Sequence, residues 1–154
     1  MGCRRAGSPT WCFVTPLVVD AGALLASINA RDPAHAAVRA VLETAAGPVV
    51  TSQLVLAEAD YMVLTRGGID LELAFLGDVL TGALRAEGLT PDELTRAVDV
   101  VARYRDLEIG MADASLVVLC ARHRTRSLLT LGERCFRAMA PLQGGAFTLL
   151  PADG

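Results

Sequence analysis

The fold is decided by residues 16–29, which read PLVVDAGALLASIN. The run Pro16–Asp20 is short, apolar and β-branched and ends in a carboxylate, which predicts a buried strand. The run Ala21–Asn29 is rich in alanine and leucine, which predicts a helix. A short buried strand that leads directly into a helix is typical of α/β proteins.

The same alternation continues along the chain. Asp32-Pro33 predicts a helix start, Gly67-Gly68 a helix end, and Thr90-Pro-Asp-Glu93 a capping box with proline at the first helical position. Together the patterns predict an α/β domain with a central, mostly parallel sheet, whose ligands bind at the carboxyl ends of the strands. Further strands are predicted at 48–51, 84–87, 127–130 and 147–150, and helices at 32–45, 52–66, 69–83, 90–104 and 111–123.

Composition narrows the classes of protein to consider. The 154 residues, 53 % of them hydrophobic, suit one domain with its own core and argue against disorder. The formal charge is −3 and all 14 cations are arginine, which argues against binding nucleic acid through bulk positive charge. No apolar run reaches the roughly 18 residues of a membrane helix, so we expect no membrane contact. The 4 cysteines form no C-x-x-C pair, which argues against zinc and favours reduced thiols in the cytoplasm.

The amino-terminal segment differs in character from the domain that follows it. Arg4-Arg5 precedes an apolar stretch, as in a secretory signal, but Asp20 interrupts that stretch. We therefore expect residues 1–14 to be a disordered extension and residues 15–154 to form a single domain.

Three carboxylates are candidates for chemistry. Asp20 ends the first strand, where α/β sheets bind ligands, although an aspartate there can simply cap the next helix. Glu58 lies within an apolar helix face, where a carboxylate is costly unless it is paired, bound to a cation or able to reach water at the rim. Asp113 opens a helix whose dipole favours its ionised form, although a first-turn aspartate is also common.

These carboxylates predict a particular chemistry. Carboxylates that converge without cysteine or histidine suit Mg²⁺ or Mn²⁺, which prefer oxygen ligands. An ion held in this way polarises a phosphoryl oxygen, and the matching reaction is phosphodiester hydrolysis. The chain has neither a nucleotide-binding glycine loop nor a G-x-S-x-G motif, which argues against those other chemistries.

Four further motifs stand in a characteristic order and spacing: 17-LVVDAGALLA-26, 55-VLAEADY-61, 109-IGMADAS-115 and 129-LTLGER-134. Together they resemble a PIN domain, and the chain resembles the toxin component of bacterial VapBC toxin–antitoxin pairs. The resemblance spans about residues 16–151 and implies a three-layer α/β/α domain. It also implies a Mg²⁺- or Mn²⁺-dependent endoribonuclease in which Asp20 and Asp113 bind the metal ion and Glu58 completes the acidic cluster. The implied partners are a VapB-like antitoxin, a second copy in a homodimer, and RNA of the tRNA or rRNA class.

Two departures from the family pattern leave alternatives open. Gly132 stands where many members have a fourth aspartate, and Ala21-Gly22 follow Asp20 where many have serine or threonine. Glu133 is displaced by one position, and Asp106 is only a weak substitute. The chain could therefore be a degenerate PIN domain that binds antitoxin or RNA with little catalysis. It could also be a PIN-like nuclease of RNA processing.

Arginines supply weaker candidates for phosphate contacts. Arg122, Arg124 and Arg126 form the densest basic segment, and Arg66 lies about two helical turns beyond Glu58. Arginine can bind phosphate in a bidentate manner. The alternatives are a solvated helix end for the first three and a salt bridge for Arg66.

Overall fold

The computed structural model describes residues 14–154, so the prediction for residues 1–14 lies, apart from Val14, outside the described residues. Its centre is a five-stranded sheet of order β3-β2-β1-β4-β5, in which every neighbouring pair is parallel. The predicted parallel α/β sheet is therefore confirmed. The strands are β1 (Leu17–Val19), β2 (Val49–Ser52), β3 (Arg85–Glu87), β4 (Ser127–Leu129) and β5 (Thr148–Leu150).

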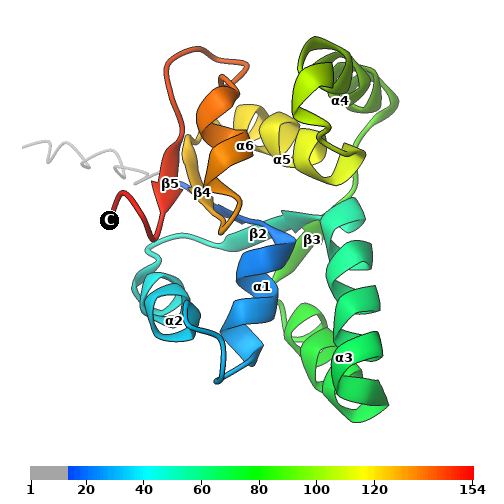
Figure 1. The fold of residues 1–154 in the computed structure, drawn as a ribbon, viewed down its shortest axis with the longest axis vertical. Coiled ribbons are helices and arrows are strands. Elements are labelled where there is room, and N and C mark those ends of the chain that lie inside the picture. The colour runs from blue at the N-terminus through cyan, green and yellow to red at the C-terminus, as the bar shows by residue number, and fades with distance from the viewer. Residues whose placement is uncertain (1–13) are drawn as a thin grey trace, which may run out of the picture.

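Helices cover both faces of the sheet and complete the three-layer α/β/α architecture. Figure 1 shows α1, α2 and α3 on one side of the sheet and α4, α5 and α6 on the other. No helix in residues 14–154 is both long enough and apolar enough to cross a membrane. The helices are α1 (Ala21–Ile28), α2 (His35–Thr44), α3 (Gln53–Leu80), α4 (Pro91–Arg103), η1 (Arg105–Leu107, a 3-10 turn), α5 (Met111–Arg122) and α6 (Glu133–Ala138).

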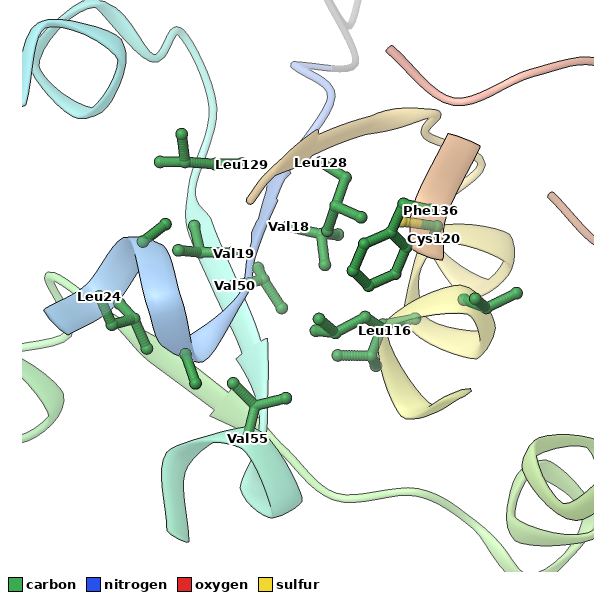
Figure 2. Packing of buried hydrophobic residues seen from close by; sticks show 14 of the residues in the cluster. Val18, Val19, Leu24, Val50, Val55, Leu116, Cys120, Leu128, Leu129 and Phe136 are labelled. Atoms are coloured by element: carbon green, nitrogen blue, oxygen red, sulfur yellow. The ribbon is translucent and has the colours of Figure 1, made fainter. Parts of the chain in front are cut away.

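The central strand β1 packs against both helical layers. Successive side chains of a strand point to opposite faces, so Val18 and Val19 enter different halves of the core. In Figure 2, Val18 lies toward Phe136 and Leu116, whereas Val19 lies on the side of Leu24, and all five are buried. This burial explains why β1 is apolar at every position, and the first polar residue, Asp20, comes directly after the strand.

The observed helix limits differ from the predicted ones at three places. Asp32 does not cap α2: its Oδ1 accepts from the Ala34 N–H at 2.8 Å in a tight turn, and the helix begins only at His35. The predicted helices on either side of Gly67-Gly68 form one helical range, α3, with a kink at Gly68 (φ 77°, ψ 179°) that glycine adopts readily. The sequence patterns do not predict the short helix α6, because six residues give no clear periodicity.

Two other helix starts follow the sequence signals. The Thr90 hydroxyl accepts from the Glu93 N–H at 3.3 Å, and the Glu93 carboxylate accepts from the Thr90 N–H at 2.8 Å. This is the predicted capping box. The Ser52 hydroxyl accepts from the Val55 N–H at 3.0 Å and starts α3 directly at the end of β2.

Candidate active site

Asp20 follows β1 and is held on both carboxylate oxygens. Its Oδ1 accepts from the Ala21 N–H at 2.7 Å, and its Oδ2 accepts from the Thr130 hydroxyl at 2.8 Å. Thr130 follows β4, the neighbour of β1, and its hydroxyl accepts from the Gly132 N–H at 2.9 Å. Asp20 therefore caps α1, which was the alternative to a functional role. It also presents a fixed carboxylate at the carboxyl edge of the sheet.

Asp113 lies in the first turn of α5. Its Oδ2 accepts from the Gly110 N–H at 3.2 Å, just before the helix begins. The positive end of the helix dipole favours the ionised carboxylate at this position. From there α5 continues as a buried helix, with seven consecutive buried residues from Ala114 to Cys120, so its first turn has little freedom to move.

Glu58 comes from α3, about one and a half turns after the helix start. Its side chain is exposed, and no hydrogen bond engages its carboxylate in the described part of the chain. A buried serine pair ties α3 to α5: the hydroxyls of Ser52 and Ser115 lie 2.6 Å apart. Because Ser115 donates to the Ala112 carbonyl at 2.5 Å, the proton between the two hydroxyls comes from Ser52. This contact fixes the helix of Glu58 relative to that of Asp113.

The three carboxylates act on one another electrostatically. Burial raises the pKa of Asp20, the hydrogen bonds from Thr130 and Ala21 partly oppose this, and the charge on Asp113 raises the pKa further. Loss of hydration raises the pKa of Glu58, and the charges of Asp20 and Asp113 add to the rise. The predicted residues of three separate elements therefore lie within electrostatic range of one another. Neighbouring negative charges of this kind favour a bound cation.

A family model described as the PIN domain matches residues 17–141 of the chain, which include all three carboxylates. The chain belongs to the PIN domain family. It is 44 % identical over 135 residues to Ribonuclease VapC26 of Mycobacterium tuberculosis, a match that covers 88 % of this chain and 100 % of the relative. The match to this relative confirms the resemblance to VapC proteins.

Two solved structures share the PIN fold. One is Mycobacterium tuberculosis VapC20, described as a sarcin-ricin loop cleaving toxin, with a TM-score of 0.67 and 23 % identity over 73 % of this chain and 86 % of that one. The other is a toxin–antitoxin complex from Klebsiella pneumoniae, with a TM-score of 0.62 and 15 % identity over 80 % and 92 % of the two chains. At these identities the two structures support the fold alone.

The carboxylates of this PIN domain fit a hard divalent cation in their chemistry. They offer only oxygen donors, and their mutual repulsion would be relieved by a positive charge. Within residues 14–154, no three acidic, histidine or cysteine side chains converge into a ready metal-binding group. In this arrangement the three carboxylates lie within electrostatic range of one another but do not form a closed set of ligands.

Gly132 lies beside Asp20 and leaves space there. A Cβ atom at Gly132 would be 3.8 Å from Asp20 Oδ2 and 3.4 Å from the Thr130 hydroxyl oxygen. Its backbone (φ −89°, ψ 46°) is not in the left-handed region that favours glycine. Glu133 does not fill the space, because its carboxylate accepts from Arg137 at 3.0 Å. Asp106, the weak substitute, lies exposed in η1.

The predicted phosphate-binding arginines lie apart from the acidic cluster. Arg122 ends α5, about 13 Å along the helix axis from Asp113. Its guanidinium donates to Glu87 at 2.7 Å, to Glu93 at 2.8 Å and to the Gly88 carbonyl at 2.8 Å. A phosphate contact would have to break these bonds, so the structure assigns Arg122 a role in joining α4 to α5.

The other three arginines remain predictions as RNA contacts. Arg126 precedes β4, at the opposite end of that strand from Thr130, and donates to the Gly144 carbonyl at 2.9 Å. Arg124 is in the left-handed region (φ 52°) beyond the end of α5. Arg66 is exposed near the kink, about 12 Å along α3 from Glu58. In residues 14–154, no ion pair links any of them to the acidic cluster.

Sequence reasoning missed Thr130 as a positioning residue, and its effect can be tested. Thr130→Val removes the donor to Asp20, and we expect RNA cleavage to fall about tenfold and stability by about 1–2 kcal/mol, because a buried hydrogen bond to a charged group is lost. Thr130→Ser keeps the hydroxyl and should retain most of both. Cleavage rates and chemical denaturation measure the two effects. Equal losses in the two variants would contradict the role of the hydroxyl.

A second variant tests the clamp made by Arg122, which is 27 % exposed, on Glu93, which is 15 % exposed. The hydrogen bond from Arg122 lowers the pKa of Glu93 from 4.5 to about 2. The stabilisation is therefore complete above pH 4.5 and is lost as the pH falls toward 2. We expect Arg122→Gln to lower the free energy of unfolding by about 1–3 kcal/mol at pH 7 and by much less near pH 2.5. Urea denaturation at both pH values measures this, and a pH-independent loss would count against the clamp.

Proposed function

We propose that the chain is the endoribonuclease toxin of a VapBC-type pair and that it hydrolyses phosphodiester bonds in RNA with Mg²⁺ or Mn²⁺. The observation that carries the proposal is the cluster formed by Asp20, Glu58 and Asp113. Burial and then the charge on Asp113 raise the pKa of Asp20, and loss of hydration and then the charges of Asp20 and Asp113 raise the pKa of Glu58. The identity of 44 % to a ribonuclease along that relative's whole length supports the same activity. We further propose that the toxin acts in the cytoplasm on RNA of the tRNA or rRNA class.

In the proposed mechanism each residue has a separate task. Asp20 and Asp113 would hold the ion, which when bound supplies positive charge to the scissile phosphate and promotes ionisation of water. Thr130 and the Ala21 N–H keep the Asp20 carboxylate in one orientation. Glu58 is exposed and has a raised pKa, so it is suited to orient the attacking water and to accept its proton.

The metal requirement is tested by cleavage of a mixed tRNA and rRNA sample. We expect cleavage with Mg²⁺ or Mn²⁺, none after EDTA, and recovery when either ion is restored. Growth arrest on expression, relieved by a small neighbouring reading frame, would distinguish a toxin from an RNA-processing nuclease. Cleavage that persists in EDTA would overturn the metal-dependent mechanism.

The proposed protein partners are a VapB-like antitoxin and a second copy of the chain. The antitoxin is proposed from the 44 % identity to a VapC ribonuclease, and a solved toxin–antitoxin complex shows that this fold occurs in such assemblies. The helix α3 exposes several large apolar side chains, among them Tyr61 (68 % exposed) and Leu73 (61 % exposed). Apolar side chains exposed to this extent suit a protein interface, which supports a homodimer. Light scattering of the purified chain measures its oligomeric state.

A degenerate PIN domain that binds without cleaving is the second candidate function. The space at Gly132 favours it, because one carboxylate fewer faces Asp20 than in many PIN domains. Robust cleavage by the unmodified chain would remove this alternative.

A further inference from the structure

A groove of about 520 Å³ lies between α4 and the segment that follows α6. Val100 forms its buried floor, and Tyr104 fixes its far wall, because the Tyr104 hydroxyl accepts from the Ala140 N–H at 2.9 Å. The groove is therefore built by the fold and does not depend on a ligand to form. Its lining is Arg96, Asp99, Val100, Arg103, Tyr104, Ala140 and Leu142.

Two exposed arginines stand on the same side of this groove. Arg96 and Arg103 are seven residues apart on α4, which places them on one helix face, two turns or about 10.5 Å apart. No ion pair engages either guanidinium in residues 14–154, in contrast to Arg122 and Arg137. Asp99 lies between the two arginines in the sequence and lines the same groove. The positive charge is therefore concentrated at the two ends of the groove.

One of the two arginines, Arg103, lies at the end of the α4–α5 pair that carries Asp113. Glu93, in the first turn of α4, contacts Arg122 in the last turn of α5, and the short turn η1 leads from the end of α4 to the start of α5. The two helices are therefore antiparallel, and the last residue of α4, Arg103, lies at the same end as Asp113 in the first turn of α5. From this end the two arginines follow α4 away from Asp113, with Arg103 nearer to it and Arg96 farther along the helix.

We propose that Arg96 and Arg103 bind two backbone phosphates of the RNA substrate, outside the acidic cluster. The inference rests on the proposed ribonuclease function and names the surface that holds the substrate away from the scissile bond. Guanidinium groups bind phosphate oxygens in a bidentate manner. The acidic cluster repels the same backbone, so an overall acidic ribonuclease needs such discrete cationic contacts to retain its substrate.

The test measures binding without cleavage. A fluorescent single-stranded RNA of twenty nucleotides is titrated in EDTA with the wild type, with Arg96→Gln/Arg103→Gln, and with the control Arg31→Gln/Arg85→Gln, which removes the same charge from exposed sites elsewhere. We expect the groove variant to lose about tenfold in affinity at 0.1 M salt, and its slope of log K against log salt to fall by about 1.4. The control should change both by much less. Asp99→Asn should tighten binding about twofold to threefold, because it removes a charge that repels phosphate.

The outcomes separate this inference from the proposed function. If the groove variant binds RNA as tightly as the control does, or if the wild type does not bind the RNA, the proposal that the groove binds RNA is overturned. In either case, cleavage of RNA with Mg²⁺ by the wild type still supports the ribonuclease function. Binding that depends on the groove in a wild type that cleaves nothing supports the groove and overturns the ribonuclease. Unchanged melting temperatures of the variants exclude loss of fold as the cause.

Discussion

Asp113→Asn should abolish RNA cleavage and at the same time stabilise the metal-free protein. A directly bound cation is worth several kcal/mol of transition-state stabilisation, so we expect a loss of about 10²–10³-fold or more. Asparagine can still accept from the Gly110 N–H, so the cap of α5 is kept, while the attraction of the charge to the helix dipole, about 0.3–1 kcal/mol, is lost. The variant lacks one of the charges that raise the pKa of Asp20 and Glu58, which removes part of the repulsion in the folded state.

The pH dependence of this stabilisation has a definite sign. Folding raises the pKa of Asp20 above 3.8 and that of Glu58 above 4.5, so the folded state binds protons more tightly than the unfolded one. The ionised cluster therefore costs stability at neutral pH, and the cost disappears as the pH falls below these ordinary values. Thermal unfolding in EDTA should show Asp113→Asn above wild type at pH 7 and close to it near pH 3.5.

Asp106→Asn is the matched control for Asp113→Asn. It removes one carboxylate from the exposed turn η1, seven residues earlier, and should leave both cleavage and the pH profile of stability unchanged. A large loss of cleavage in Asp106→Asn would instead give Asp106 the role of the fourth carboxylate. Full activity of Asp113→Asn would remove the acidic cluster from the mechanism.

Gly132→Asp should strengthen metal binding and raise cleavage. The new Cβ lies 3.8 Å from Asp20 Oδ2, so the added carboxylate enters the cluster, and the backbone there accepts an L side chain without strain. One further oxygen ligand and one further negative charge should tighten Mn²⁺ binding about tenfold, which is about 1.4 kcal/mol. Calorimetric titration with MnCl₂ measures the affinity, and cleavage is followed at limiting metal.

Two other substitutions at the same position show whether the effect of Gly132→Asp depends on its charge. Gly132→Asn adds the same shape without the charge, and Gly132→Ala tests only the extra Cβ. Neither should tighten Mn²⁺ binding by more than about twofold. Activity that appears in Gly132→Asp from an inactive parent would establish the degenerate binding module. An unchanged Mn²⁺ affinity would show that Gly132 does not face the metal position.

Much of the fold and of the acidic cluster is visible in the sequence because it depends on local patterns. The strand Pro16–Asp20 ends at its first polar residue, and in a parallel sheet the carboxyl ends of neighbouring strands share one edge. That rule by itself places Asp20 at a ligand-binding edge. The capping box at Thr90 and the glycine pair at the α3 kink are likewise short-range signals.

The contacts that position the cluster are not local, and the sequence does not reveal them. Thr130 reaches Asp20 across 110 positions of the chain, and Ser52 reaches Ser115 across 63. Hydroxyl side chains of this kind follow strands in many proteins without any such role. The ion pairs of Arg122 are equally hidden in the sequence, because Glu87 and Glu93 lie 35 and 29 residues away from it. Without them, Arg122 reads as a free arginine that is available to bind phosphate.

The double role of Asp20 decides which inactive form of the protein is useful in the laboratory. Its carboxylate holds the first turn of α1, so replacing it loosens that helix end by about 1 kcal/mol and confuses folding with chemistry. The variant Asp113→Asn, in contrast, keeps an acceptor for the Gly110 N–H. A harmless version of this protein, for producing it in quantity and trapping uncut RNA on it, should therefore be made at position 113.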